Sequence, residues 1–403
     1  MADTRAAQLR RLWLNVHLWI ALSLVALLVP ISISGSLLVW HDEIDSVLNP
    51  KRYAVSGPQV SLQPSEYLAK AEAAVADDPT KPRATALRYP EPGWPVRATM
   101  RAQPREAGAR PRLLNVYLDP PTGKVLDVVD FRASLFGFLH VFHENLTIPE
   151  YSGRQIVGWA GVGMLILSLT GIWLWWPRGG DFRRGLRWRR SPLFTFNLHH
   201  LLGFWISLPL AVVSATGIYL SFPQTARETM SSIAPMTPQG QRGFGQVAQH
   251  TALTADQALA AALKAEPNGK PVALFLPVQQ RERPLAWRTQ ISRAGSGDIV
   301  TLMTDDQSGQ TSPAVVPLSG DRAAAWIRWI HEGSRGGPVW AVLVTLTGIF
   351  PISLRSQASS CGCASVPIAR KWLGKAPNRA YVPPSDRVVL GLEGRKDRTF
   401  NDL

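Results

Sequence analysis

Residues 12–40 read LWLNVHLWIALSLVALLVPISISGSLLVW, an apolar stretch that contains no Asp, Glu, Lys or Arg and whose only ionisable side chain is His17. A helix needs roughly 20 apolar residues to cross a bilayer, so this stretch predicts a membrane-spanning helix. A cleaved signal peptide fits less well, because the apolar run exceeds a signal h-region and no clear A-x-A cleavage site follows it. The length also disfavours a buried core helix of a soluble protein.

Three further segments lack all four charged residue types, namely Ile156–Trp176, Phe194–Phe222 and Val339–Leu354. The last is short, but the stretch Ala323–Ile330 before it is also largely apolar. The chain is 46% hydrophobic although its mean hydropathy is close to zero, which is typical of apolar spans joined to ordinary polar domains. The sequence therefore predicts an α-helical membrane protein with four transmembrane helices.

The formal charge of +14 first suggests a nucleic-acid-binding protein. Most of this charge, however, lies in the N-terminal leader, in the arginine-rich loop after Trp176 and in the tail from Arg355 onward. With four spans these three stretches share one side, and the positive-inside rule makes that side the cytoplasm. We therefore expect no nucleic-acid partner. We expect a bacterial inner-membrane protein, surrounded by lipid, with both termini in the cytoplasm.

The first and third spans align without a gap. Asn15–Leu18 matches Asn197–His200, and eighteen residues after each aligned histidine comes a glycine, in Ser34–Ser36 and in Thr216–Ile218. A match of this kind over two distant apolar segments indicates an internal repeat.

The other parts of the chain correspond as well. The second and fourth spans share the sequence LTGI, at 169–172 and 346–349. In each outward loop a predicted strand runs into an Asp/Gly turn, near 116–123 and near 302–309. The sequence therefore predicts two parallel repeats, each with a periplasmic α+β domain between its two spans.

These features set the predicted boundaries. They are a cytoplasmic leader at 1–11, a first span at 12–40, a periplasmic domain at 41–134, a periplasmic helix and loop at 135–154, a second span at 155–176, a basic cytoplasmic loop at 177–193, a third span at 194–222, a second periplasmic domain at 223–322, a periplasmic helix with the fourth span at 323–355, and a cytoplasmic tail at 356–403.

Six of the eight histidines cluster at the ends of the predicted spans. An ionisable side chain in a membrane is costly and by default functional, and neutral imidazole is a common ligand of metals and of haem iron. A b-type haem between helices needs one histidine from each of two facing helices. The repeat supplies His17 with His199 at the cytoplasmic face, and His143 with His331 at the periplasmic face. The sequence thus predicts two haem b groups.

Two neighbouring histidines leave the choice of ligand open. His140 or His200 could replace its neighbour, or hydrogen-bond to the haem. The alternative for any single histidine is a hydrogen bond to water or lipid, which explains two repeat-related pairs less well. His41 and His250 lie outside the pattern and are expected at the surface. Since no C-x-x-C-H motif occurs, the haem is expected to bind without covalent links.

Smaller features accompany the aligned histidines. Ala21 and Gly203 follow them by four residues and would let a flat macrocycle lie against the helix. Asn15 and Asn197 either orient the site or cap a helix. The two cysteines of the segment Cys361–Cys363 are too few for a closed zinc site and are expected to be incidental.

Two sequence elements, TGIWLWWPR at Thr170–Arg178 and LHHLLG at Leu198–Gly203, join the repeat in carrying a family resemblance. Up to about Arg355 the chain resembles the PepSY-associated transmembrane family. Its members include inner-membrane reductases of iron-loaded siderophores, which have four helices, two periplasmic PepSY-like domains and b-type haem. The resemblance implies a PepSY-like domain in each outward loop. It also implies the haem ligands His17, His143, His199 and His331.

The functional prediction is a transmembrane haem oxidoreductase that passes electrons from a cytoplasmic or quinol donor to a ferric siderophore in the periplasm. Reduction to Fe(II) weakens a hard-oxygen chelate and frees the metal. A transporter is a second class, but it predicts charged residues along the spans, and the four segments contain none. A third class is a membrane-anchored regulator, which leaves the paired histidines unexplained.

Overall fold

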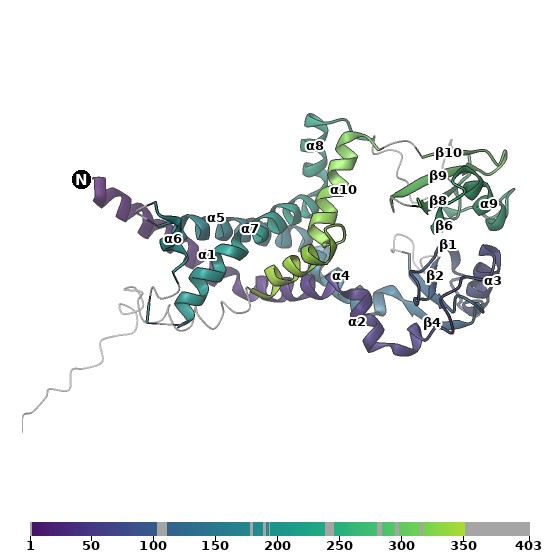
Figure 1. Cartoon of the computed structure of the whole chain (residues 1–403), viewed down its shortest axis with the longest axis horizontal. Helices are drawn as coiled ribbons and strands as arrows, with labels where there is room; N and C mark the ends of the chain where they lie inside the picture. Colours follow the sequence, from purple (N-terminus) through teal and green to yellow (C-terminus); the bar gives the residue numbers. More distant parts are fainter. Residues whose placement is uncertain are drawn as a thin grey trace, which may run out of the picture. The chain divides into compact units, whose positions relative to one another are not determined.

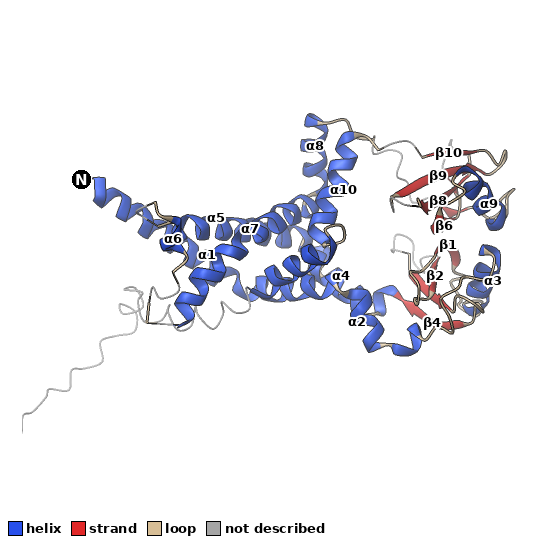
Figure 2. Cartoon of the chain, viewed as in Figure 1, coloured by secondary structure: helices blue, strands red, loops and turns tan. Residues whose placement is uncertain are grey.

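The computed structural model of the chain describes residues 2–102, 111–177, 180–187, 191–192, 194–237, 246–279, 284–294, 298–314 and 317–350. Long helices form one part of this structure (Figure 1), and strands with short helices form another (Figure 2). The predicted cytoplasmic tail at 356–403, with Cys361 and Cys363, lies outside the described residues.

Among the described residues, three helices are long and apolar enough to cross a membrane: α1 (Ala2–Val39), α5 (Gly153–Trp175) and α7 (Phe194–Ser221). They coincide with the first three predicted spans. Helix α1 begins well before residue 12, because the leader is rich in Ala, Leu, Gln and Arg, which favour helix. The chain is therefore a membrane protein with several candidate transmembrane helices.

A shorter apolar helix covers Gly337–Phe350, within the fourth predicted span. It lies against the end of α1. There the Ser36 hydroxyl donates to the Thr345 carbonyl at 3.0 Å, and the Trp40 indole donates to the Thr345 hydroxyl at 2.7 Å. At 1.5 Å per residue its described part rises about 21 Å, less than the roughly 30 Å of a bilayer core. The remainder of the predicted span lies outside the described residues.

Helix α5 contacts both α1 and α7, and its glycines set how closely these helices approach. A Cβ at Gly163 would clash with Leu24 of α1, and one at Gly158 would lie 2.5 Å from the ring of Phe222, at the end of α7. Ala160 of α5 is buried in a small apolar cluster with side chains of α1 and α7. Small residues allow this close packing, on which helix association in membranes depends.

The strands form one eight-stranded antiparallel sheet in the order β10-β9-β8-β6-β1-β2-β3-β4, beside a two-stranded sheet of β5 and β7. The bounds are β1 (Arg83–Arg88), β2 (Val96–Arg101), β3 (Leu113–Leu118), β4 (Val125–Asp130), β5 (Gln246–Val247), β6 (Lys270–Phe275), β7 (Val278–Gln279), β8 (Ala286–Ser292), β9 (Ile299–Asp305) and β10 (Thr311–Pro313).

This sheet joins strands from the two outward loops, each of which was predicted to form an α+β domain. The first outward loop contributes β1 to β4 and the second contributes β6, β8, β9 and β10, and the two halves meet where Leu87 of β1 pairs with Leu274 of β6. Each half alone would expose an edge strand, and an exposed edge is a template for unwanted pairing. The pairing of β1 with β6 covers the edge that each of these two strands would otherwise expose.

Two helices cover one face of the sheet, α3 (Pro64–Ala74) and α9 (Ala255–Ala265). The core beneath them includes Leu87, Leu274 and Trp287, all buried. Each helix begins with a capping box, which satisfies backbone N–H groups at its first turn. The other face of the sheet carries the alternate residues of each strand, because successive side chains point to opposite faces.

The remaining described elements are short. They are α2 (His41–Leu48), η1 (Pro50–Tyr53), η2 (Phe131–Ala133), α4 (Leu135–Asn145), η3 (Pro149–Tyr151), α6 (Phe182–Gly185), α8 (Pro223–Ile233) and α10 (Ser319–Glu332). Two of them, α4 and α10, carry histidines of the predicted site.

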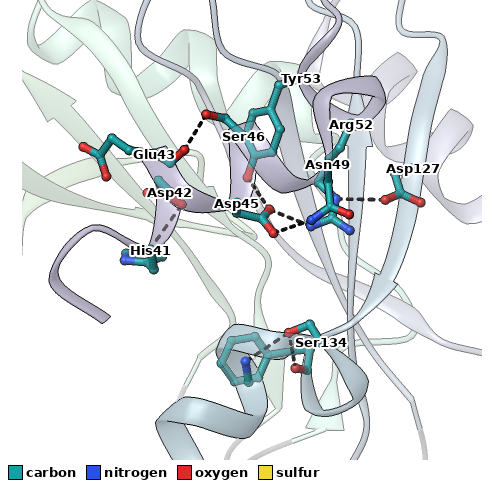
Figure 3. A network of polar contacts seen from close by, with 12 residues as sticks. His41, Asp42, Glu43, Asp45, Ser46, Asn49, Arg52, Tyr53, Asp127 and Ser134 are labelled. Atoms are coloured by element: carbon teal, nitrogen blue, oxygen red, sulfur yellow. Dashed lines mark hydrogen bonds and ion pairs between the residues drawn. The ribbon is translucent and has the colours of Figure 1, made fainter. Parts of the chain in front are cut away.

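Arg52 ties the segment after α1 to the sheet (Figure 3). Its guanidinium donates to Asp45 at 2.6 Å and to Asp127 of β4 at 2.8 Å, and the Tyr53 hydroxyl donates to Asp45 at 2.6 Å. The side chains of Arg52 and Asp45 are only 10% and 12% exposed. Because a buried carboxylate is tolerated only when it is paired and hydrogen-bonded, this network fixes α2 and η1 against β4.

Candidate functional site

Two pairs of histidine rings meet in the structure. His17 of α1 and His199 of α7 have ring centroids 6.4 Å apart, with the ring planes at 75°. His143 of α4 and His331 of α10 have ring centroids 6.1 Å apart, with the planes at 43°. All four side chains are partly buried. The structure therefore brings together the same two pairs that the internal repeat predicts.

His143 and His331 stand in the last turns of α4 and α10, and both helices end in the same way. The residues that follow, Leu146 and Gly333, adopt left-handed backbone with φ of 57° and 77°. A left-handed residue stops a helix and turns the chain away. Each helix therefore presents its histidine at its very end and does not continue past the ring.

Backbone carbonyls of the membrane helices orient these two rings. The Nδ1–H of His143 donates to the Ile31 carbonyl of α1 at 2.9 Å, and the Nδ1–H of His331 donates to the Val213 carbonyl of α7 at 3.0 Å. A carbonyl oxygen can only accept, so Nδ1 carries the proton in both rings. Nε2 is thereby left with a free lone pair, as is usual for a histidine that binds a metal.

Hydroxyl groups next to these carbonyls repeat the same pattern. Ser34 lies 3.2 Å from Nδ1 of His143, and Thr216 lies 3.2 Å from Nδ1 of His331. Each hydroxyl also donates to a backbone carbonyl of its own helix. Ser34 and Thr216 are aligned in the sequence repeat, so the surroundings of the two rings are equivalent.

For His17, the group that contacts Nδ1 is the hydroxyl of Thr170 of α5. This hydroxyl lies 2.8 Å from Nδ1 of His17 and donates its own hydrogen to the Ile166 carbonyl at 2.7 Å. A hydroxyl has a single hydrogen, so the His17 ring must be the donor in the contact with Thr170. The Nε2 atom of His17 is therefore also left unprotonated.

A glycine lies under each ring of the second pair. A Cβ at Gly35 of α1 would lie 2.7 Å from Cε1 of His143, and a Cβ at Gly217 of α7 would lie 2.8 Å from Cε1 of His331. Both positions tolerate only glycine unless the ring moves. By contrast, among the described residues the nearest atom to a Cβ at Gly203 would belong to Phe350, at an ordinary distance of 3.9 Å.

A cavity of about 580 Å³ adjoins His143 and His331. Its walls are mostly apolar side chains of α1, α5 and α7, and Glu144, Arg154 and Arg328 also line it. Burial, with a smaller contribution from His331, lowers the pKa of His143 to about 4. Burial likewise lowers the pKa of His331. Both imidazoles are therefore neutral at physiological pH, the form in which imidazole binds metals.

The second-choice histidines make other contacts. His140 is exposed; its ring lies 6.3 Å from that of Phe131, and its Nε2 lies 3.9 Å from Glu144. The His200 ring stacks on Trp175 at 5.9 Å and on Phe196 at 6.2 Å.

The remaining predicted positions behave as ordinary structural residues. His41 and His250 are exposed, as expected. Asn15 is exposed within α1, so it caps no helix end. Asn197 is buried and holds the chain before α7, since its side chain donates to the Ser191 carbonyl at 2.7 Å and accepts the Ser191 N–H at 3.0 Å.

The repeat aligns Gly35 with Gly217, but the sequence alone gives these glycines no role and does not distinguish Ser34, Thr216 or Thr170 from their neighbours. The signal was present, because these residues stand in the segments that define the repeat. The sequence does not show which helix packs against each of these segments. Only the structure places α4 and α10 against the carbonyls and glycines of α1 and α7.

A comparison with curated protein sequences finds no match. The family model described as the PepSY-associated TM region matches residues 14–355, which include all four paired histidines, the whole of α5 and α7 and most of α1. The match covers most of the chain and agrees with the resemblance stated above. The chain belongs to the PepSY-associated TM region family.

Proposed function

We propose that this membrane protein is a haem b oxidoreductase that passes electrons across the bacterial inner membrane and reduces a ferric siderophore in the periplasm. The proposal rests on the close approach of the two rings within each repeat-related histidine pair, His17 with His199 and His143 with His331. The electron donor is a cytoplasmic reductant or a membrane quinol. Reduction to Fe(II) weakens an oxygen-rich chelate, and the iron is released.

The spacing of the rings fits two imidazoles on one iron. Each metal-bound nitrogen lies about 2 Å from the metal, and the ring centre lies roughly 1 Å further, as ring bond lengths require. The expected distance between centroids is therefore roughly 6 Å, against the observed 6.4 Å and 6.1 Å. Within the described residues no cluster of three or more His, Cys, Asp or Glu is placed to hold a metal; in the proposed site a macrocycle would supply the remaining ligands of the iron.

The chain's own residues provide the rest of the site. The Ile31 and Val213 carbonyls and the Thr170 hydroxyl fix the tautomer of their histidines. The cavity beside His143 and His331 is apolar and, at about 580 Å³, falls in the range of cofactor pockets. When bound there, a haem supplies a one-electron carrier whose potential depends on its axial ligands and on burial.

We also propose four transmembrane helices in two parallel repeats. The symmetric strand order supports this layout, because the strands β1, β2, β3, β4 and the strands β6, β8, β9, β10 follow one another outward from the β1–β6 junction. The helix Gly337–Phe350 corresponds to α5 through the shared LTGI sequence. Reporter fusions after Trp176 should score cytoplasmic, and fusions at Gly123 and Gly309 periplasmic. A reversal at any site would contradict the orientation.

A visible-light spectrum of the detergent-purified protein tests the redox proposal against its alternatives. Two bis-histidine haems should give α and β bands that sharpen with dithionite, together with haem that acid acetone extracts. A membrane-anchored regulator or a transporter predicts a folded, colourless protein. A colourless preparation that is folded and free of iron would overturn the proposal.

A further inference from the structure

Three arginines lie together on the sheet face that α3 and α9 leave uncovered. Arg88 of β1 pairs directly with Arg97 of β2, and Arg288 of β8 pairs with Phe275 of β6. Their neighbours along the strands, Leu87 and Trp287 among them, belong to the core under the two helices. Because side chains alternate along a strand, the three arginines point to the opposite face.

The arginines surround the junction of the two half-sheets. Arg97 and Arg288 hold matching places, since each pairs with the last residue of the strand next to the junction, Arg88 or Phe275. The three arginines stand on β8, β1 and β2, and because β6 lies between β8 and β1 the group spans about 14 Å across the sheet. Arg88 and Arg288 are exposed and Arg97 is partly exposed, so the charges are accessible from solvent.

The close placement of the three arginines lowers the stability of the sheet. Like charges directly opposite each other on neighbouring strands repel, and in the described residues no carboxylate forms an ion pair with any of the three guanidiniums. Partial desolvation lowers the pKa of Arg88, and the charges of Arg97 and Arg288 lower it further. Arg288 instead stacks on Phe275, with its Cζ 3.8 Å from the ring centroid, and Arg88 lies 5.6 Å from the same ring.

The flanking residues are suited to a polar ligand. Thr99 and Gln290 stand next to the arginines on the same face. Arg97 also lines a cavity of about 270 Å³ together with Asn115 and Tyr117; the same cavity contains Asp42 and Asp45, of which Asp45 is paired with Arg52. The one large apolar side chain of the group, Phe275, is covered by Arg288. A bilayer surface would favour exposed apolar side chains at such a site, so a soluble anion fits better than a lipid headgroup.

We propose that Arg88, Arg97 and Arg288 form a docking site for an anionic iron chelate, one whose carboxylate or catecholate oxygens leave it with a net negative charge. Guanidinium groups bind oxyanions with short, charge-assisted hydrogen bonds. The choice of an iron chelate as the ligand rests on the proposed function. The inference narrows the substrate to anionic chelates and disfavours cationic hydroxamate complexes.

Binding of gallium citrate to the full-length protein in detergent tests the site without electron transfer, because Ga(III) is not reduced as Fe(III) is. Calorimetry at low salt should show saturable binding that weakens as NaCl is raised, since salt screens exposed charges. The cationic gallium complex of a trihydroxamate with a free amine should bind at least tenfold more weakly. Equal binding of both complexes, or binding unaffected by salt, would overturn the inference.

Charge-removing variants locate the site. Arg97→Gln and Arg288→Gln should each weaken gallium citrate binding about tenfold, the loss of one charge-assisted contact. Arg97→Lys should retain most of the affinity. Arg293→Gln is the matched control, because Glu266 already pairs with that guanidinium at 2.6 Å, and it should leave binding unchanged. Unchanged affinity in both Arg97→Gln and Arg288→Gln would overturn the assignment, as would binding of phosphatidylglycerol vesicles in place of gallium citrate.

The two proposals fail in different ways. A protein that contains haem but does not bind gallium citrate would overturn the docking site and leave the redox function in place. A colourless protein that binds gallium citrate through the same arginines would support the anion site while overturning the redox function. Circular dichroism of each variant shows whether it is folded, and the salt and charge comparisons on the unchanged protein stand even where a variant does not fold.

Discussion

The imidazole of His143 lies directly on Gly35, so closely that a Cβ at this glycine would stand 2.7 Å from Cε1 of the ring. The same relationship holds between His331 and Gly217. A ring held between a helix backbone and a carbonyl acceptor has little freedom to turn. The glycine therefore helps to set where Nε2 points, although it makes no hydrogen bond itself.

Gly35→Ala should displace the His143 ring. Alanine is the better helix former by about 1 kcal/mol, so propensity alone would stabilise α1, whereas overpacking of this kind costs about 1–3 kcal/mol. We expect lower thermal stability and loss of one of the two proposed haems. Gly171→Ala is the matched control, since its Cβ would meet Ser207 and His17 at ordinary distances of 3.5 and 3.6 Å. Equal haem content in the two variants would contradict the prediction.

Thr170→Val should loosen the His17 ring, because it removes the hydroxyl that accepts the Nδ1–H. Loss of such an orienting partner costs about 10- to 100-fold in metal affinity. Thr216→Val makes the same change near His331, where the Val213 carbonyl remains as acceptor at 3.0 Å, and should have a smaller effect. The rate of haem transfer to excess apomyoglobin measures how firmly each variant holds its haem. Faster loss from Thr216→Val than from Thr170→Val would argue against this account.

The sequence alone predicted that His17 and His199 would lie close together, because the repeat places them in equivalent spans. It could not choose between His199 and His200, which lie about 100° apart on one helix turn. The structure shows that His200 stacks on Trp175 and Phe196. Phe196 lies one turn before His200 on the same helix, but Trp175 comes from α5, and a neighbour from another segment leaves no mark in the local pattern.

The junction of the two half-sheets was equally beyond the sequence. Both outward loops carried readable strands and Asp/Gly turns, and Gly123 and Gly309 do adopt positive φ there. The pairing of Leu87 with Leu274, however, joins strands from different loops. The alternation of side chains along a strand specifies which face of a sheet is buried, but it does not specify which edge strand of one half-sheet pairs with which edge strand of the other. The arginine group at the junction was therefore not visible either.

Arg52→Leu should destabilise the α+β region strongly. The substitution leaves the Asp45 carboxylate buried without its 2.6 Å partner, and breaking a buried pair in this way costs about 3–5 kcal/mol. Arg293→Leu, which removes an exposed pair with Glu266, should cost far less because solvent screens it. Thermal unfolding followed by near-ultraviolet circular dichroism compares them. Similar melting temperatures for the two variants would mean that the network does not hold α2 and η1 in place.

Replacement of the paired histidines separates the two proposed sites. His→Ala removes a neutral ligand and leaves no unbalanced charge, so the helices should still insert into the membrane. His143→Ala and His331→Ala should lose the periplasmic haem, whereas His17→Ala and His199→Ala should lose the cytoplasmic one. Each variant should retain about half of the haem, as measured by absorbance and iron content, and should lose ferric-chelate reduction driven from the cytoplasm.

The two pairs should differ when a small chemical reductant is supplied from the periplasmic side. His17→Ala and His199→Ala keep the ring pair nearest the substrate, so they should still reduce the chelate, whereas His143→Ala and His331→Ala should not. His41→Ala serves as a control, because that side chain is exposed and outside both pairs. Full haem content and full cytoplasm-driven activity in His17→Ala and His199→Ala would show that the pairing is wrong.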